Sequence, residues 1–122
     1  MTQKWIIIWK KELYNYKQLI RDINNNLHNG FINQHYRHNQ NTFPNINDIV
    51  YIQIQGHIIM KSIIINTNLI HTTNDMYEYI NFNKNYSKGC VIQIIEIYDN
   101  PIKFPFFNRT HWSNITNKLP LV

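Results

Sequence analysis

Two apolar runs joined at a glycine constrain the fold of this chain more than any other feature. The run "DIVYIQIQG" (residues 48–56) alternates along its length, which is typical of a strand with one face in a core. Gly56 predicts a tight turn, and "HIIMKSIII" (57–65) then returns as the partner strand of a hairpin. The expected core face of the first strand carries Val50, Ile52 and Ile54, and its opposite face carries Ile49, Tyr51 and Gln53.

Two further runs predict strands because they are apolar, rich in β-branched residues and too short for helices. They are "KWIIIWK" (residues 4–10) and "GCVIQIIEIY" (89–98). Alternation in the first of them places Trp5, Ile7 and Trp9 on one face and Ile6 and Ile8 on the other. Since both faces are apolar, we expect this strand to lie centrally in a sheet.

The segment "NYKQLIRDINNNLHNG" (residues 15–30) changes to a helical period. Asn15 followed by Gln18 resembles a capping box, and Gly30 marks a C-terminal stop. The sequence therefore predicts the main helix here. Its apolar stripe consists of Leu13, Tyr16, Leu19, Ile20, Ile23 and Leu27.

Polar or proline-interrupted segments separate these elements. Residues 30–41 ("GFINQHYRHNQN") predict a polar loop, which ends in a turn at 43–48. The other segments are a polar stretch at 66–88 with a short helical turn around 76–80, a Pro-interrupted connector at 99–108, and a short closing helix at 109–119.

The order of these elements predicts an α+β fold. We expect a small curved mixed β-sheet or partial β-barrel, with the main helix packed across it. A length of 122 residues predicts a single domain over residues 1–122. The one cysteine, Cys90, excludes an internal disulfide and suits a reducing compartment. With no signal-like leader and no run long enough to span a membrane, we expect a cytoplasmic, intracellular protein.

Basic and aromatic residues share two windows of the chain that contain no acid. The net charge is +5, and all seven acidic residues lie outside residues 23–47 and 100–122. A polyanion that also offers flat rings, such as nucleic acid, fits this mixture. The alternative is a solvated basic surface with ordinary core aromatics. The windows contain Arg37, Lys103, Arg109 and Lys118 together with Phe31, Tyr36, Phe43 and Trp112.

The order of motifs resembles the PUA-like superfamily, in particular its EVE and YTH branches. "WIIIWKKELYNYKQLI" (residues 5–20) is similar to the first strand and helix of EVE-type domains. "GFINQHYRHNQNTFPNINDIVYIQIQG" (30–56) is similar to their aromatic and Arg/Asn loop with the strand that follows. "VIQIIEIYDNPIKF" (91–104) and "HWSNI" (111–115) resemble a late strand with a Pro-led connector and a late tryptophan. The chain is rich in Ile, Asn, Lys and Tyr, whose codons are AT-rich, and has tryptophans near both ends. These two features also resemble a tryptophan-repeat protein family of insect poxviruses.

The PUA-like resemblance implies a domain that takes a modified base, flipped out of its strand, into an aromatic pocket. Asp48 is expected to pin the turn before its strand, in an Asn-Asp pair where the family has Gly-Asp. Trp9 also fits a buried core residue, and Trp112 also fits an anchor for the tail. Phe31 stands where the family usually has a tryptophan. The implied site residues are Trp9, Phe31, Tyr36, Asn39 and Trp112 for the base pocket, and Lys10, Arg37 and Arg109 for the nucleic-acid backbone.

Catalytic, metal and cofactor motifs are not found in the sequence. His35 and His38 are three residues apart, but no carboxylate or cysteine neighbours them, so no metal site is predicted. No nucleophile has a base at a suggestive spacing, and there is no Gly-rich phosphate loop. Cys90 opens an apolar strand, which predicts an inert buried thiol. We therefore expect neither catalytic activity nor a cofactor.

The ligand class stays open between three alternatives. The resemblance favours single-stranded RNA carrying N6-methyladenine, with methylated or hydroxymethylated cytosine in DNA as the second ligand. The competing hypothesis is a viral host-interaction module that keeps the fold but binds a protein or a small nucleotide. A protein-binding patch would be built on Phe104, Phe106 and Phe107.

Overall fold

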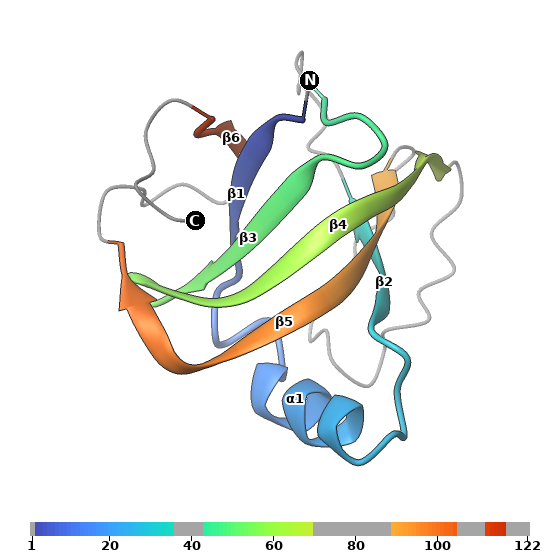
Figure 1. The fold of residues 1–122 in the computed structure, drawn as a ribbon. Coiled ribbons are helices and arrows are strands. Elements are labelled where there is room, and N and C mark those ends of the chain that lie inside the picture. Colours follow the sequence, from blue (N-terminus) through green and yellow to red (C-terminus); the bar gives the residue numbers. More distant parts are fainter. Residues whose placement is uncertain (1, 36–42, 70–88, 105–111, 117–122) are drawn as a thin grey trace.

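A computed structural model describes residues 2–35, 43–69, 89–104 and 112–116, which form a mixed six-stranded sheet and a single helix (Figure 1). The strand order is β2-β5-β4-β3-β1-β6. β1 runs parallel to β3, and the other neighbouring pairs are antiparallel. A small mixed sheet with a helix confirms the predicted α+β class. The strands are β1 (Lys4–Ile8), β2 (Phe31–His35), β3 (Ile49–Ile54), β4 (His57–Leu69), β5 (Gly89–Lys103) and β6 (Ser113–Asn114).

Both faces of β1 are buried, as its apolar sequence predicted. The strand lies between β3 and β6. Trp5 and Ile7 point into the main core, which lies inside the curve of the sheet. Ile6 points the other way, into a second apolar cluster on the outer face. The buried members of this second cluster are Ile6, Tyr51, Ile58, Phe104 and Ile115.

The β3–β4 hairpin turns at Gln55 and Gly56, which both have positive φ, 49° and 74° respectively. Ile54 is paired with His57 across this two-residue turn. Two consecutive left-handed residues are typical of a type I′ turn, whose twist matches that of the strands. The predicted hairpin is therefore confirmed. So is the predicted core face of β3, because the main core contains Val50, Ile52 and Ile54.

The sheet curves so strongly that strands far apart in its order share one core (Figure 1). β5, β4 and β3 separate β2 from β1 in the sheet. Nevertheless Nε1 of Trp9, directly after β1, donates a hydrogen bond to Oε1 of Gln34 in β2 at 3.1 Å. Ile32 of β2 also packs into the same main core as Trp5. A single curved sheet thus encloses most of its own core.

Asp48 pins the turn before β3, as expected, and also ties the start of the chain to it. Its side chain is 3% exposed. One carboxylate oxygen accepts a hydrogen bond from the backbone N–H of Gln3 at 3.0 Å. The other accepts from Nε1 of Trp5 at 3.0 Å and from the backbone N–H of Asn45 at 2.8 Å. These bonds fix β1 beside β3 at the end where both strands begin.

α1 (Tyr16–Asn24) is shorter than the predicted helix and lies at one end of the curved sheet (Figure 1). Leu19 anchors it, because this side chain is buried in the main core. Leu27 was predicted on the buried stripe but is 76% exposed, since the helix ends before it. Asn15 makes no side-chain cap hydrogen bond, so the predicted capping box is not formed.

β2 lies where the sequence predicted a polar loop. Its five residues pair antiparallel with β5, so this part of the prediction is wrong. Gly30 leads into the strand with a φ of 83°, and its carbonyl accepts a hydrogen bond from the N–H of Ile94 at 2.9 Å. Among the described side chains of the strand, Ile32 is the one that belongs to the main core. Residues 36–41 of the predicted loop lie outside the described residues.

Strands also replace two other predicted segments. β5 continues through the predicted connector to Lys103. Pro101 falls where the pairing with β4 shifts register between Ile97 and Ile102, so its missing N–H coincides with an irregularity of the ladder. β6 pairs with β1 at the place where a closing helix was predicted. The predicted helical turn at 76–80 lies outside the described residues.

Candidate functional site

Trp9, predicted as a wall of the base pocket, belongs to the main core. It is 1% exposed. Its ring stacks on Tyr14, with the ring centroids 4.6 Å apart and the planes at 3°, and its Nε1 is bonded to Gln34. In this structure Trp9 is therefore a buried core residue, which is the alternative that the sequence left open, and its ring supports the ring of Tyr14.

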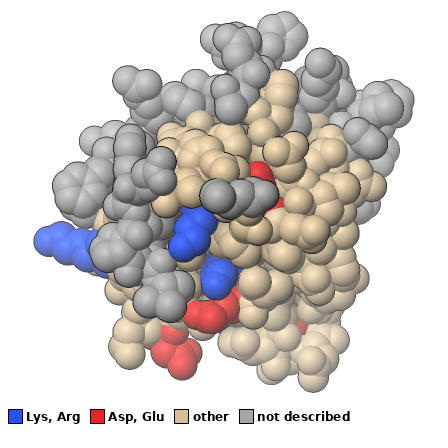
Figure 2. Space-filling view, turned by 45° about the horizontal axis from the view of Figure 1, so that its top comes forward, with Lys and Arg blue, Asp and Glu red and all other residues tan. Residues whose placement is uncertain are grey.

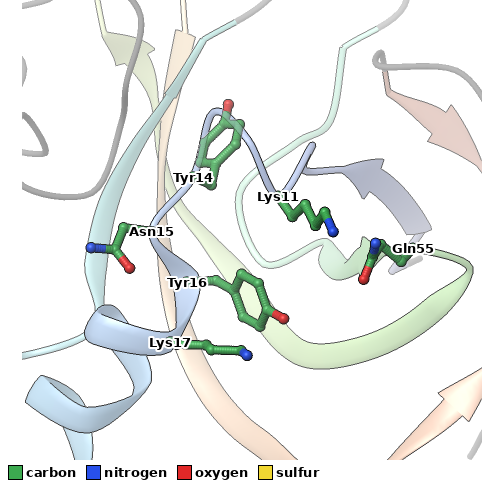
Figure 3. Close-up of a pocket in the computed structure, with 6 residues that line it drawn as sticks. All are labelled: Lys11, Tyr14, Asn15, Tyr16, Lys17 and Gln55. Atoms are coloured by element: carbon green, nitrogen blue, oxygen red, sulfur yellow. The ribbon is translucent and has the colours of Figure 1, made fainter.

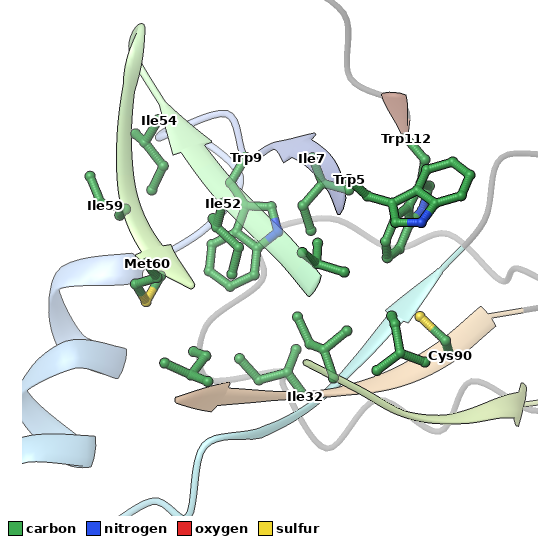
Figure 4. Packing of buried hydrophobic residues seen from close by; sticks show 14 of the residues in the cluster. Trp5, Ile7, Trp9, Ile32, Ile52, Ile54, Ile59, Met60, Cys90 and Trp112 are labelled. Carbon is green, nitrogen blue, oxygen red and sulfur yellow. The ribbon is translucent and has the colours of Figure 1, made fainter. Parts of the chain in front are cut away.

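Trp112 is also buried, with 5% of its side chain exposed. It packs edge-on against Trp5, with centroids 6.5 Å apart and planes at 79° (Figure 4). This contact holds the described C-terminal segment against β1. It fits the alternative in which Trp112 anchors the tail, and a role in base binding stays a prediction.

Phe31 lies on the opposite side of the sheet from Trp9. It is 41% exposed, whereas its neighbour Ile32 is buried in the main core. Because neighbours along a strand point to opposite faces, Phe31 faces outward while Trp9 lies inside. The two side chains therefore lie on different faces of the sheet in this structure, and a role of either in base binding stays a prediction.

Of the remaining predicted site residues, Lys10 is described and exposed. His38, the partner of His35 in the pair considered for a metal, lies outside the described residues. Within the described part of the chain, no three His, Cys, Asp or Glu side chains gather as metal ligands would. Four other site predictions stay untested because they too fall outside it: Tyr36, Arg37, Asn39 and Arg109.

An open hollow lies between the start of α1 and the β3–β4 hairpin (Figure 3). We call it the lysine–tyrosine hollow. Backbone hydrogen bonds from Leu13 and Tyr14 to the carbonyl of Lys10, at 2.9 and 3.1 Å, shape the segment before the helix. Stacking on the buried Trp9 fixes Tyr14. The hollow has a volume of about 310 Å³ and is lined by Lys11, Tyr14, Asn15, Tyr16, Lys17 and Gln55.

The lysine–tyrosine hollow combines positive charge, aromatic rings and amides. Figure 3 shows the polar ends of Lys11, Tyr16 and Lys17 directed toward the side where Gln55 lies. The described lining contains no carboxylate. Ammonium groups suit phosphate oxygens, and aromatic rings suit the faces of bases. The arrangement fits an anionic ligand that carries a planar ring.

The sequence contains a signal for this hollow that lies outside the two acid-free windows. "KKELYNYK" (residues 10–17) interleaves lysines with Tyr14 and Tyr16. Glu12 lies in the same segment, and it excluded the segment from those windows. Gln55 could be added only from the fold, since the hairpin brings it to the helix start.

Charge alone does not mark a binding surface on the face shown in Figure 2. There, the Lys and Arg side chains near the centre of the view lie beside Asp or Glu side chains. The local combination of residues in the hollow is therefore more informative than the net charge of +5.

Two tyrosines associated with the outer face stay protonated near neutral pH. Burial raises the pKa of Tyr98 to about 12, with a further contribution from Glu96. Burial, and then Glu96, also raise the pKa of Tyr51, whose hydroxyl has no hydrogen-bond partner among the described residues. Neither phenol is therefore a proton acceptor at neutral pH.

Comparisons with protein-family models, with curated proteins and with solved structures find no match for this chain. The fold and the hollow are therefore the observations that bear on function. Among the described residues, no helix combines the length and the apolar character that crossing a bilayer requires.

Proposed function

We propose that this chain is a non-catalytic nucleic-acid-binding domain. The observation that carries the proposal is the lysine–tyrosine hollow, where Lys11 and Lys17 lie beside Tyr16 with no carboxylate in the described lining. The two ammonium groups would contact phosphates, and the ring of Tyr16 would stack on a base. Stacking of this kind contributes about 1–3 kcal/mol per base and does not depend on sequence.

The specificity that we propose is for a modified base flipped out of its strand. N6-methyladenine in single-stranded RNA is the first ligand, and methylated or hydroxymethylated cytosine in DNA is the alternative. The support is the ordered PUA-like resemblance of the sequence, with which a small curved mixed sheet is compatible. Flipping a base costs least in a strand that is already single, which favours single-stranded ligands.

The competing protein-binding patch has less support among the described residues. Phe104 is buried in the second apolar cluster and is therefore not available to a partner. Phe106 and Phe107 lie outside the described residues.

Paired oligonucleotides test the proposal. The full chain is titrated with single-stranded RNA and DNA of one sequence, each with and without a methyl group on one adenine or one cytosine. We expect single strands to bind and one modified member to bind more tightly than its unmodified partner. Equal and negligible binding to every member of the set would contradict the proposal.

A further inference from the structure

A second hollow adjoins the lysine–tyrosine hollow and shares Tyr16 and Gln55 with it. We call the two together the composite groove. The first hollow is its basic half, and the second is its apolar half. The apolar half has a volume of about 440 Å³ and is lined by Tyr16, Ile54, Gln55, His57, Ile59 and Pro101.

The apolar half is assembled from strands that the curved sheet brings together. Ile54 of β3 and Ile59 of β4 are buried and form its base. Pro101 of β5 and His57 of β4 are exposed at its rim. Pro101 reaches this position because β5 runs beside the hairpin, with Lys103 paired to His57. An apolar base with a ring-bearing rim suits a flat, weakly polar ligand group.

Gln55 is held at the junction of the two halves. Nδ1 of His57 lies 3.1 Å from the carbonyl oxygen of Gln55. The N–H of Phe104 donates to the carbonyl of Gly56 at 2.8 Å, which ties the turn to the end of β5. The Gln55 amide can both donate and accept hydrogen bonds, as the edge of a nucleobase does.

We propose that the composite groove binds one nucleotide unit, with the base ring in the apolar half and its phosphate at Lys11 and Lys17. This inference rests on the proposed function and adds which part of the nucleotide each half contacts. A phosphate placed over Ile54 and Ile59 would lose hydration against apolar side chains, whereas Lys11 and Lys17 offer it opposite charge, so the charge distribution favours this orientation.

NMR titrations of the full, isotope-labelled chain test this placement with three probes: adenosine, adenosine 5′-monophosphate and a single-stranded oligoadenylate. We expect the monophosphate and the oligonucleotide to shift the amide signals of Ile54, Gln55 and Ile59. Adenosine should shift the same signals but bind at least about tenfold more weakly, because it lacks the phosphate. Equal affinity for adenosine and its monophosphate would contradict the role of the two lysines.

A matched pair of variants tests the same placement through affinity. Pro101→Glu puts a carboxylate at the rim of the apolar half, whereas Asn100→Glu adds the same charge at an exposed neighbour that does not line the groove. We expect Pro101→Glu to weaken oligonucleotide binding by about tenfold or more, and Asn100→Glu by less than about threefold. Thermal unfolding establishes that both variants fold.

The outcomes separate this inference from the proposed function. The groove assignment is wrong if oligonucleotides bind without shifting the amide signals of Ile54, Gln55 and Ile59 and still bind to Pro101→Glu. That result would leave nucleic-acid binding itself standing. Failure of the wild-type chain to bind any of the three probes overturns the groove assignment, and the proposed function falls with it if the methylated oligonucleotides also fail to bind. Groove shifts with the monophosphate but not with the oligonucleotide support the groove and contradict the proposed function.

Discussion

A single buried carboxylate, Asp48, joins the beginning of the chain to the strand that pairs with it. Both of its oxygens are occupied by N–H donors from Gln3, Trp5 and Asn45. Hydrogen bonds to an ionised acceptor are about twice as strong as neutral ones, and they compensate for the burial of the charge. The position therefore depends on a carboxylate and not merely on a polar side chain of similar size.

Asp48→Asn should lower the free energy of unfolding by about 2–4 kcal/mol. The new amide nitrogen cannot accept a hydrogen bond, and its N–H groups would face donors that are already buried. Urea unfolding measures the change. Asp99→Asn, at an exposed position, is the matched control and should change stability by less than about 0.5 kcal/mol. Equal stability of the two variants would contradict the role of Asp48.

Tyr98 should make the protein less stable at high pH. Its pKa is raised from 10.0 to about 12 by burial, by Glu96 and Tyr51, and by a hydrogen bond with Glu96. Above pH 10 the unfolded chain loses this proton while the folded chain keeps it, so the stabilising contribution present below pH 10 is lost as pH rises toward about 12. The phenolate absorbance of wild type minus that of Tyr98→Phe, followed as pH rises, gives the midpoint of the Tyr98 titration. A titration midpoint near pH 10 in the folded protein would show that the pKa of Tyr98 is not raised.

At the scale of elements, Gly30 allows β2 to approach β5 closely. Its φ is 83°, and a Cβ at this position would lie 3.1 Å from the carbonyl oxygen of Ile94. Backbone cannot move aside as easily as a flexible side chain. Both the left-handed conformation and the limited space therefore favour glycine at this position.

Gly30→Ala should destabilise the protein by more than Gly56→Ala does. Gly56 has a similar φ of 74° but nothing within 4 Å of an added Cβ, so its substitution carries only the conformational cost, about 1–2 kcal/mol. The difference between the two free energies of unfolding measures the clash beside Ile94. Equal losses would mean that β5 moves away without cost.

Elements with strong apolar alternation were predictable from the sequence, and elements held by neighbours were not. β1, β3 and β4 consist of apolar runs that pack into the two clusters, with one irregularity at Ile59, and the predictions for them are confirmed. β2 contributes Ile32 to the main core from an otherwise mostly polar stretch, so its strand forms because β5 offers a partner edge. The sequence did not predict that β5 continues to Lys103, because a proline usually ends a strand. Here Pro101 falls at a register shift, where the strand tolerates it.

At the scale of the whole molecule, the curvature of the sheet decides which distant segments lie side by side. Trp9 and Phe31 were both predicted as pocket residues, but Trp9 lies in the core inside the curved sheet, whereas strand alternation turns Phe31 to the outer face. The same curvature brings the start of α1, the β3–β4 hairpin and β5 around the composite groove. Such a meeting of distant segments depends on three-dimensional packing, which no local sequence pattern reports.

The central claim is that nucleic acid binds at this groove. The salt dependence of oligonucleotide binding, measured for wild type and for Lys17→Gln, tests it most directly. For wild type, the logarithm of the association constant should fall linearly with the logarithm of salt concentration. Lys17→Gln should weaken binding and reduce the slope by about 0.7, the value for one phosphate contact with a single strand. Lys61→Gln, whose side chain does not line the groove, should keep the wild-type slope. Binding that does not change with salt, or an equal slope in all three proteins, would contradict the claim.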